Sequence, residues 1–514
     1  MTRIKDIYVG LPEGKDEFTS SEDDWYESFF EPASIDEGAL SSRKKYFLQG
    51  YRGTGKTSYL RWFGYRRRKE GKFVKFILFK SNITEPVREV ISKSQGYDFV
   101  SSEGGRIEFA QDFKEVWKWF IFHSIGQELR TSRLPGDIFE DYLKLLGLNP
   151  SDQYPFGKIL GMIPRIENKK IEIIADTKFF KAKLSGDVEE KSGKAFTSLA
   201  ALNLALEEEF KKIILRQDIF IIFDELEVFY EDQSYYDRDR RFVRDLIWAI
   251  DYLNQFFRLN SPRVFLIGAI RTEVLAALGN LSQEIQRLVI GRGERLSWHG
   301  KRRSLKHPLI EMFVKKIHYS VTGKSLARGE VIDHISLYFP DKINGVSLDR
   351  YLLDRSFYKP RDIVHRLEAA KTEFPDEIKF SEEALTGSEK IYSNAMLEEL
   401  RLELSAYFSE KEISAVQLLF SGQPSRFTLD DFEARADRLR RMASGIDTLR
   451  QRVGLLELLN TLFSLGAVGN EFSDASRGGR RNRKNIWIFR GDNTLLPHKQ
   501  MVLNRSLWKA LTTT

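Results

Sequence analysis

Residues 46–60, YFLQGYRGTGKTSYL, constrain the fold of this chain more than any other stretch. A short apolar strand leads into a glycine-rich turn, and a run with helical character follows. Glycines let successive backbone N–H groups turn toward one anion, and the helix that follows directs the positive end of its dipole to the same point. The pattern G-x-x-x-x-G-K-[ST] is matched by Gly50, Gly53, Gly55, Lys56 and Thr57. The stretch therefore predicts a strand, a loop and a helix that hold phosphate groups.

Different residues of this loop are expected to bind different parts of a magnesium triphosphate. We expect Lys56 to contact the β- and γ-phosphates and the Thr57 hydroxyl to bind Mg²⁺, which prefers oxygen ligands. The alternative is a glycine turn followed by an ordinary surface lysine. The residues expected to contact the nucleotide are Gly50, Tyr51, Arg52, Gly53, Thr54, Gly55, Lys56, Thr57 and Ser58.

Composition excludes several other classes of protein. The chain has 514 residues, 42% of them apolar and 30% charged, which is typical of a globular protein with more than one domain. It has no cysteine, which excludes disulfides, thiolate zinc sites and a cysteine nucleophile. No apolar run approaches the roughly eighteen residues that cross a bilayer, and the first residues lack a signal-peptide core. We therefore expect a cytoplasmic protein with no membrane partner.

A second segment, residues 218–227 (DIFIIFDELE), predicts a strand that ends in two carboxylates. Its five consecutive apolar residues suit a strand buried on both faces of a parallel sheet. Ligands of open α/β sheets bind at the carboxyl ends of the strands, where Asp224 and Glu225 would lie. Asp224 is placed to bind Mg²⁺ through water, and Glu225 to orient and activate an attacking water molecule. The segment thus has the form of a Walker B motif.

The order of these segments resembles that of the AAA+ and STAND branches of P-loop ATPases. After the acidic strand come an amphipathic helix, residues 238–257, and a strand, residues 263–270, that ends in Arg271. In STAND proteins an arginine at this strand end often senses the γ-phosphate, and Arg271 resembles it; the alternative is a surface ion pair with Glu273. The resemblance implies ATP and Mg²⁺ as cofactors. The segment between Thr57 and Asp224 is much longer than in compact AAA+ proteins, which favours an origin-recognition-like or STAND-like switch ATPase of the type found with anti-phage defence systems.

Further arginines match this resemblance in order along the chain. Arg292 and Arg295 precede an expected short strand, near the place of the AAA+ arginine finger that reaches a neighbouring subunit. Lys359, Pro360 and Arg361 open a helix at a place that resembles the sensor 2 segment or the lid motif. Arg361 would either approach bound phosphate or anchor the helix in its own domain.

The C-terminal residues resemble a winged helix. Helical patterns are followed by RGGRRNRK and by an expected strand, residues 486–489, so that a hairpin follows a group of helices. A basic hairpin tip suits contact with a phosphate backbone. The alternatives are a solvated hairpin and a protein-docking module. The tip residues are Arg477, Arg480, Arg481, Arg483 and Lys484.

Together these features predict an α/β protein with a P-loop NTPase core, a parallel sheet, a helical insertion, a helical lid and a C-terminal winged-helix-like domain. The insertion would include a hairpin near residues 171–184, and the N-terminal extension is assigned no chemistry. The expected parts are residues 1–42 as an extension, 43–320 as the core with an insertion at 83–215, 321–395 as the lid and 396–514 as the winged-helix-like domain.

The expected function is that of an ATP-binding, Mg²⁺-dependent NTPase. Its nucleotide state would control docking to DNA or RNA or to an effector protein on a separate chain. The same residues leave two alternatives open. One is a DNA-binding regulator or initiator-like protein that uses ATP as a structural ligand. Another is a scaffold that recruits an effector, and homo-oligomers are compatible with each of these.

Overall fold

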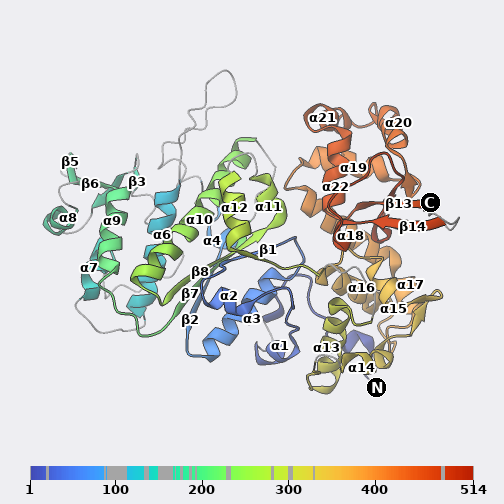
Figure 1. The fold of residues 1–514 in the computed structure, drawn as a ribbon, viewed down its shortest axis with the longest axis horizontal. Helices are drawn as coiled ribbons and strands as arrows, with labels where there is room; N and C mark the ends of the chain where they lie inside the picture. Colours follow the sequence, from blue (N-terminus) through green and yellow to red (C-terminus); the bar gives the residue numbers. More distant parts are fainter. Residues whose placement is uncertain are drawn as a thin grey trace.

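The structure is a computed structural model, and Figure 1 shows its arrangement. A central sheet is flanked by helices, an inserted region lies at one end, and the helical C-terminal half lies at the other. The described residues are 2–14, 16–18, 22–85, 88, 113–131, 138–148, 166–167, 170–173, 177–184, 188–191, 194–226, 233–278, 283–298, 305–327, 330–475 and 481–512.

Five parallel strands form the central sheet in the order β2-β7-β8-β1-β9. The predicted α/β class and parallel sheet are therefore confirmed. One local expectation is wrong, because Arg295 does not precede the last strand but ends it. The strands are β1 (Phe47–Gly50), β2 (Phe73–Leu78), β7 (Ile219–Leu226), β8 (Val264–Arg271) and β9 (Gly293–Arg295).

The apolar run of β7 is divided between the two faces of the sheet. Ile221 and Phe223 belong to one hydrophobic core, and Phe220 and Ile222 belong to the other. Successive side chains of a strand point to opposite faces, so a strand that is covered on both sides must be apolar at every position. This burial fixes β7 in the interior and leaves its carboxyl end to carry polar groups.

Helices cover both faces of this sheet. On one face, Phe63 of α3 (Lys56–Lys69) packs edge-on against Phe220 with ring centroids 5.6 Å apart. On the other face lies α10 (Gln233–Asn260), and Phe113, just before α6 (Lys114–Thr131), stacks on its Phe242 at 4.1 Å. The amphipathic helix expected over residues 238–257 is thus confirmed.

The insertion combines the expected helices with an antiparallel sheet of order β3-β4-β6-β5, which is larger than the single hairpin predicted from the sequence. The hairpin expected near residues 171–184 is wrong in its second half, which is the helix α8. Phe180 and Leu184 are both buried and lie four residues apart, a spacing that puts them on one helical face. The elements are α4 (Phe79–Asn82), α7 (Ile138–Leu145), β3 (Ile166–Glu167), β4 (Lys170–Ile173), α8 (Thr177–Lys183), β5 (Val188–Lys191), β6 (Lys194–Ser198) and α9 (Leu199–Phe210).

The N-terminal residues fold against the core instead of extending from it. Trp25 is buried, and Phe29 stacks on Trp62 of α3 with ring centroids 5.3 Å apart. The elements are two 3₁₀ turns, Ile4–Asp6 and Asp16–Phe18, and the helices α1 (Glu22–Ser28) and α2 (Glu37–Ser41).

Between the sheet and the C-terminal region lies a group of helices with one short hairpin. The helix α16 begins at Pro360, where proline is favoured because its missing N–H would have no helical partner. None of the helices in the described ranges is both long and apolar enough to cross a membrane. The elements of this group are α13 (Pro308–Thr322), α14 (Val331–Tyr338), β10 (Lys342–Ile343), β11 (Val346–Ser347), α15 (Leu348–Leu353), α16 (Pro360–Glu373), α17 (Glu382–Gly387) and α18 (Glu389–Leu404). Before them, α11 (Thr272–Ala277) and α12 (Gln283–Arg292) connect β8 to β9 within the core.

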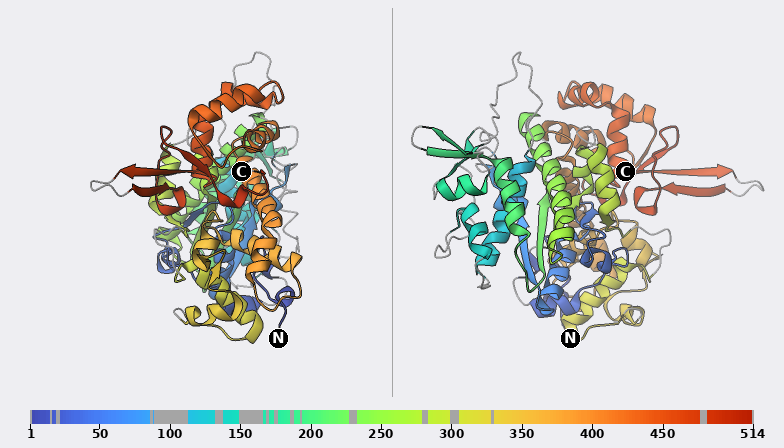
Figure 2. Two further views of the ribbon diagram at one scale, coloured as in Figure 1. Left: turned by 90° about the vertical axis from the view of Figure 1, so that its right-hand side faces the viewer. Right: turned by 60° about the vertical axis from the view of Figure 1, so that its left-hand side comes forward.

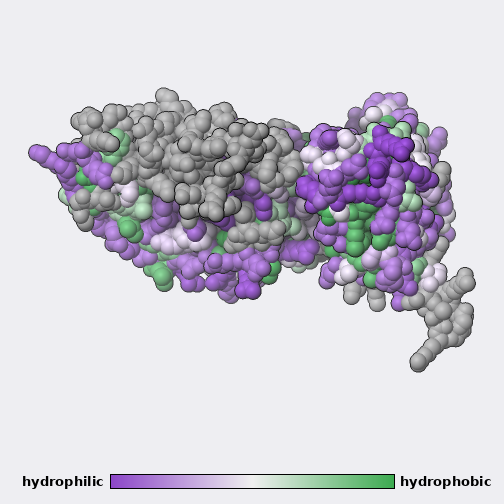
Figure 3. Space-filling view, turned by 90° about the horizontal axis from the view of Figure 1, so that it is seen from above, coloured by the Kyte–Doolittle hydropathy of each residue, from purple (hydrophilic) through white to green (hydrophobic). Residues whose placement is uncertain are grey.

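The C-terminal region combines helices with a four-stranded sheet of order β12-β15-β13-β14. Figure 2 shows the β13–β14 hairpin extending away from the body, and Figure 3 shows hydrophilic side chains gathered over the end that carries α20 and α21. The elements are α19 (Glu410–Phe420), β12 (Arg426–Phe427), α20 (Leu429–Leu439), α21 (Gly445–Arg452), α22 (Leu455–Ser464), β13 (Val468–Ala475), β14 (Arg481–Ile486) and β15 (Met501–Leu503).

The strand expected over residues 486–489 is wrong. β14 ends at Ile486, because the Asp492 carboxylate accepts the N–H of Trp487 at 3.0 Å and Ile488–Arg490 forms a 3₁₀ turn. Phe489 then stacks on Tyr358 with ring centroids 4.6 Å apart, so these aromatic residues join the C-terminal region to the helices before it.

Candidate functional site

The glycine loop, residues 50–57, joins β1 to the start of α3. Gly53 and Gly55 have φ angles of 76° and 90°, in the left-handed region that other residues adopt only with strain. At Gly50 a Cβ atom would lie 2.6 Å from Thr54 Oγ1. The loop conformation therefore requires glycine at these positions, and Gly55 directly precedes the first turn of α3.

Lys56 is buried at the first position of α3. Its Nζ atom donates to the carbonyl oxygens of Gly50 at 2.7 Å and Tyr51 at 2.9 Å. Burial lowers the pKa of Lys56 to about 8, although the charges of Glu273 and Asp224 oppose this shift. The amine is thus held against the loop by neutral carbonyl groups, and a nearby anion would stabilise its charged form.

Asp224 lies at the carboxyl end of β7, with only 3% of its surface exposed. Its Oδ1 atom accepts the backbone N–H of Glu225 at 2.8 Å. Its Oδ2 atom is buried and has no hydrogen-bond partner among the residues that the structure describes. A buried carboxylate oxygen without a donor is costly on its own, and a cation or a water molecule bound to a cation would satisfy it.

Glu225 departs from regular strand geometry. Its φ of 59° is rare for a residue other than glycine, and the pairing of β7 with β8 shifts register between Phe223 and Leu226. Its Oε2 atom accepts a hydrogen bond from Ser81 Oγ, on α4, at 2.9 Å. Such local strain is often found at functional sites. The contact with Ser81 was not anticipated from the sequence, in which no pattern links the two residues.

One pocket is lined by these groups and by two arginines from elsewhere in the chain. The register pairs Gly50 with Arg271 and Leu78 with Asp224, so the ends of the parallel strands meet at one edge of the sheet. The predicted site residues that line the pocket are Arg52, Gly53, Gly55, Lys56, Thr57, Ser58, Asp224, Glu225, Arg271 and Arg361.

Three residues of the loop do not line this pocket. Tyr51 and Thr54 line a smaller pocket together with Trp298 and Lys359, and Trp298 Nε1 donates to the carbonyl oxygen of Thr54 at 2.8 Å. Gly50 instead accepts a hydrogen bond from Lys56 and packs closely against Thr54. These three residues therefore support the conformation of the loop and do not line the larger pocket.

Arg361 lies in the pocket and also anchors the helix that it helps to open. It lines the pocket, and a Cβ atom at Gly53 would lie 3.1 Å from Arg361 Cβ, so α16 packs directly on the glycine loop. Its guanidinium also donates to Pro12 O at 2.7 Å and Glu399 Oε2 at 2.8 Å, which anchors α16 to the N-terminal segment and to α18. The neighbouring Lys359 forms a buried ion pair with Glu403 of α18.

The alternative partner for Arg271, Glu273, is not a surface residue. Only 1% of Glu273 is exposed, and its Oε1 atom accepts the backbone N–H of Arg52 at 3.2 Å. This carboxylate, in the first turn of α11, therefore holds the backbone of the glycine loop.

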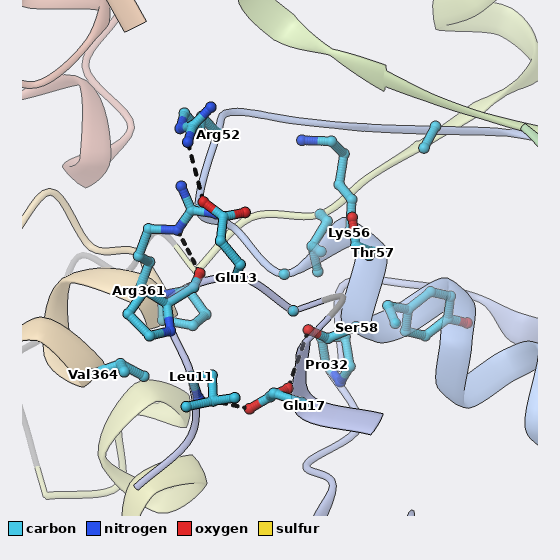
Figure 4. Close-up of a pocket in the computed structure, with 18 of the residues that line it drawn as sticks. Leu11, Glu13, Glu17, Pro32, Arg52, Lys56, Thr57, Ser58, Arg361 and Val364 are labelled. Carbon is cyan, nitrogen blue, oxygen red and sulfur yellow. Dashed lines mark hydrogen bonds and ion pairs between the residues drawn. The ribbon is translucent and has the colours of Figure 1, made fainter. Parts of the chain in front are cut away.

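The N-terminal segment supplies a wall of the pocket that the sequence did not indicate. Figure 4 shows Leu11, Glu13 and Glu17 facing the start of α3 and Arg361. Glu17 is buried, and its carboxylate accepts hydrogen bonds from Lys316, Tyr8 and Trp25, which stabilise this wall. Aromatic and apolar residues extend the pocket beyond the charged groups. They are Val9, Phe29, Phe30, Pro32, Tyr59, Trp298 and Met312.

The remaining predicted residues lie outside this pocket. Arg292 and Arg295 are exposed at the end of α12 and in β9. Arg481, Arg483 and Lys484 belong to β14, an edge strand of the C-terminal sheet. Arg477 and Arg480 lie outside the described residues.

One part of the chain matches a known family. Residues 307–401 match the FunZ-associated C-terminal helical domain. The match runs from the residue before α13 into α18, so it contains Lys359, Arg361 and Glu399 but not the glycine loop. No curated protein matches the chain.

Proposed function

We propose that this chain is an ATP-binding, Mg²⁺-dependent NTPase that acts as a nucleotide-controlled switch. One observation carries the proposal. Lys56 and Thr57 lie in the first third of the chain, yet they share a pocket with Asp224, Glu225 and Arg271 at the carboxyl edge of the parallel sheet. Cations and helix N–H groups on one side and carboxylates on the other suit a phosphate chain with a bound metal ion.

The residues of the pocket fit this ligand. Backbone N–H groups of the glycine loop and the positive end of α3 would bind phosphate oxygens, and Lys56 would turn from its two carbonyl partners to the β- and γ-phosphates. The Thr57 hydroxyl and the unsatisfied Asp224 Oδ2 would hold Mg²⁺. When bound, Mg²⁺ supplies positive charge that offsets charge on the phosphoryl oxygens.

Glu225 and Arg271 would serve the hydrolytic step. Glu225 would orient a water molecule and accept its proton, and the hydrogen bond from Ser81 Oγ to Glu225 Oε2 would hold the carboxylate in position. Arg271, at the end of β8 beside the glycine loop, would contact the γ-phosphate and stabilise its charge. The apolar extension of the pocket suits a nucleoside base.

The proposal extends to a core of the P-loop type related to AAA+ and STAND proteins, and to a C-terminal region that docks DNA, RNA or an effector protein. Support for docking comes from the β13–β14 hairpin with its basic edge strand. The resemblance to a winged helix is incomplete, because β15 lies between β12 and β13. Homo-oligomers, a cytoplasmic location and a role in anti-phage defence belong to the same proposal.

Equilibrium titration tests the function directly. The full chain should bind a non-hydrolysable ATP analogue saturably, Mg²⁺ should strengthen this binding, and ATP should release phosphate only when Mg²⁺ is present. Absence of binding at millimolar analogue would contradict the proposal. Binding without phosphate release, together with salt-sensitive DNA binding, would favour the alternative of a DNA-binding regulator that uses ATP as a structural ligand.

The low pKa of Lys56 predicts a pH dependence of nucleotide affinity. Without ligand, the amine loses its proton as the pH rises through about 8, and only its charged form attracts phosphate. Affinity for the analogue should therefore be full below about pH 8 and should fall by up to about tenfold per pH unit above it. Lys56→Arg stays charged over this range, so any binding it retains should vary little with pH. A pH-independent affinity of the unmodified chain up to about pH 10 would refute this reasoning.

A further inference from the structure

The carboxylate of Glu13 bridges two guanidinium groups in the pocket of the glycine loop. Arg52 Nη2 donates to Glu13 Oε1 at 3.1 Å, and Arg361 Nη2 donates to Glu13 Oε2 at 3.1 Å. Figure 4 shows Glu13 between the two arginines, on the side of the pocket that faces Lys56 and Thr57. An acidic side chain thus neutralises positive charge beside the loop proposed to hold phosphates.

A second carboxylate binds the same arginines, but its surroundings differ. Glu399 of α18 accepts from Arg52 Nε at 3.3 Å and from Arg361 Nη1 at 2.8 Å. Burial alone would raise the pKa of Glu399, but the nearby His365, whose Nε2 atom lies 3.6 Å from Glu399 Oε1, and the charges of Arg361 and Arg52 hold it well below its usual value. The side chain of Glu399 is 12% exposed, whereas that of Glu13 is 44% exposed. Glu399 is therefore a fixed partner and Glu13 an exchangeable one.

The position of Glu13 is close to the proposed phosphate site. Arg52 belongs to the glycine loop, and Arg361 packs on Gly53. At Gly14, the next residue after Glu13, a Cβ atom would lie 2.4 Å from Ser58 Oγ in the first turn of α3. The segment that carries Glu13 thus lies against the start of α3, where the positive end of the helix dipole would attract an anion.

We propose that Glu13 is a tethered anion that competes with the phosphate groups of the nucleotide for Arg52 and Arg361. This inference rests on the proposed function and adds regulation to it. A polyphosphate carries more negative charge than one carboxylate and offers several oxygens for bidentate pairing with guanidinium groups. Nucleotide binding releases Glu13 from both arginines, while Glu399 keeps its contacts and holds the two arginines in place.

The proposal predicts that removing the charge of Glu13 strengthens triphosphate binding. When a competing contact occupies the site, the apparent affinity for a ligand is proportional to the fraction of molecules in which the site is open. Glu13→Gln raises this fraction, so the variant should bind a non-hydrolysable ATP analogue about fivefold more tightly. Isothermal titration of the full chain measures this change. Adenosine, which has no phosphate, should bind the variant and the unmodified chain equally.

The matched control is Glu22→Gln, which removes the same charge from the N-terminal segment. Glu22 forms an exposed ion pair with Arg68 at 3.0 Å and does not line the pocket. This variant should leave the affinity for the analogue unchanged. A similar gain in Glu22→Gln would show that net charge alone acts, and it would overturn the proposal.

Other outcomes separate this inference from the proposed function. If the unmodified chain binds the analogue and Glu13→Gln binds it equally or more weakly, competition by Glu13 is refuted while the nucleotide site stands. An equal gain for adenosine would indicate general opening of the pocket and would also refute competition. If neither protein binds the analogue, the proposed function and this inference both fail. Binding by Glu13→Gln alone would support both.

Discussion

Replacing Lys56 with alanine is expected to weaken binding of a non-hydrolysable ATP analogue by about 100-fold, to the edge of detection. Hydrogen bonds between a charged donor and phosphate oxygens contribute about 1.5–3 kcal/mol, which corresponds to roughly 10- to 150-fold in affinity. Lys56 lies in a buried position where no water can replace its charge fully. Its two carbonyl partners in the loop would also lose their donor.

Isothermal titration with the full chain measures this loss, and thermal unfolding checks that the variant is folded. Lys69→Ala is the matched control, because Lys69 ends the same helix and its charge pairs with Asp23 on the surface. The control should bind the analogue as the unmodified chain does. If the folded Lys56→Ala variant kept an affinity within about twofold of the unmodified chain, Lys56 would have no role in phosphate binding.

Glu225→Gln should keep nucleotide affinity and slow ATP hydrolysis by about 100- to 1,000-fold. Loss of a general base commonly reduces a rate by about 10²–10⁴-fold, and glutamine keeps the shape of the side chain without accepting a proton. Ser81→Ala should slow hydrolysis by a smaller factor, about three- to tenfold, because it removes one hydrogen bond that orients Glu225. Phosphate release at saturating ATP measures both rates.

An exposed carboxylate provides the control for these rates. Glu208→Gln removes a carboxylate that pairs with Lys211 on the surface of α9, and it should hydrolyse ATP at the unmodified rate. If Glu225→Gln turned over ATP as fast as Glu208→Gln, the proton acceptor would be another group. If Glu225→Gln lost nucleotide affinity as well, the carboxylate would serve binding instead of the hydrolytic step.

The sheet and the charged groups at its edge follow from local patterns in the sequence. The five apolar residues before Asp224 require burial on both faces, and in a parallel sheet this places Asp224 at the edge where strands end. The glycine loop also follows from a local pattern, since positive φ angles favour glycine at Gly53 and Gly55 and close contact with Thr54 leaves no room for a side chain at Gly50. Topology then brings Asp224 close to Lys56 despite the long insertion between them.

The N-terminal wall could not be predicted in this way. Glu13 lies in an irregular segment with no periodic pattern, and its partners Arg52 and Arg361 are distant in sequence. The contact between Ser81 and Glu225 likewise depends on the packing of two neighbouring strand ends. A single carboxylate or hydroxyl carries no local sequence signal of its tertiary partner.

The secondary structures that were wrongly predicted contain aromatic residues whose packing outweighs strand propensity. Residues 177–183 form a helix because Phe180 and Leu184 are buried on one face. β14 ends before Phe489, whose ring packs against Tyr358 and Trp487 instead of continuing a strand. In both places tertiary contacts selected the local conformation.

The central claim is that Lys56, Thr57, Asp224 and Glu225 share one ligand at the edge of the sheet. A crystal structure of the full chain with Mg²⁺ and a non-hydrolysable ATP analogue tests it most directly. We expect phosphate oxygens within hydrogen-bond distance of Lys56 Nζ and Mg²⁺ bound to the Thr57 hydroxyl, with Asp224 beside the metal. An analogue bound elsewhere, with Lys56 Nζ still donating to the carbonyl oxygens of Gly50 and Tyr51, would show that these four residues do not share a ligand.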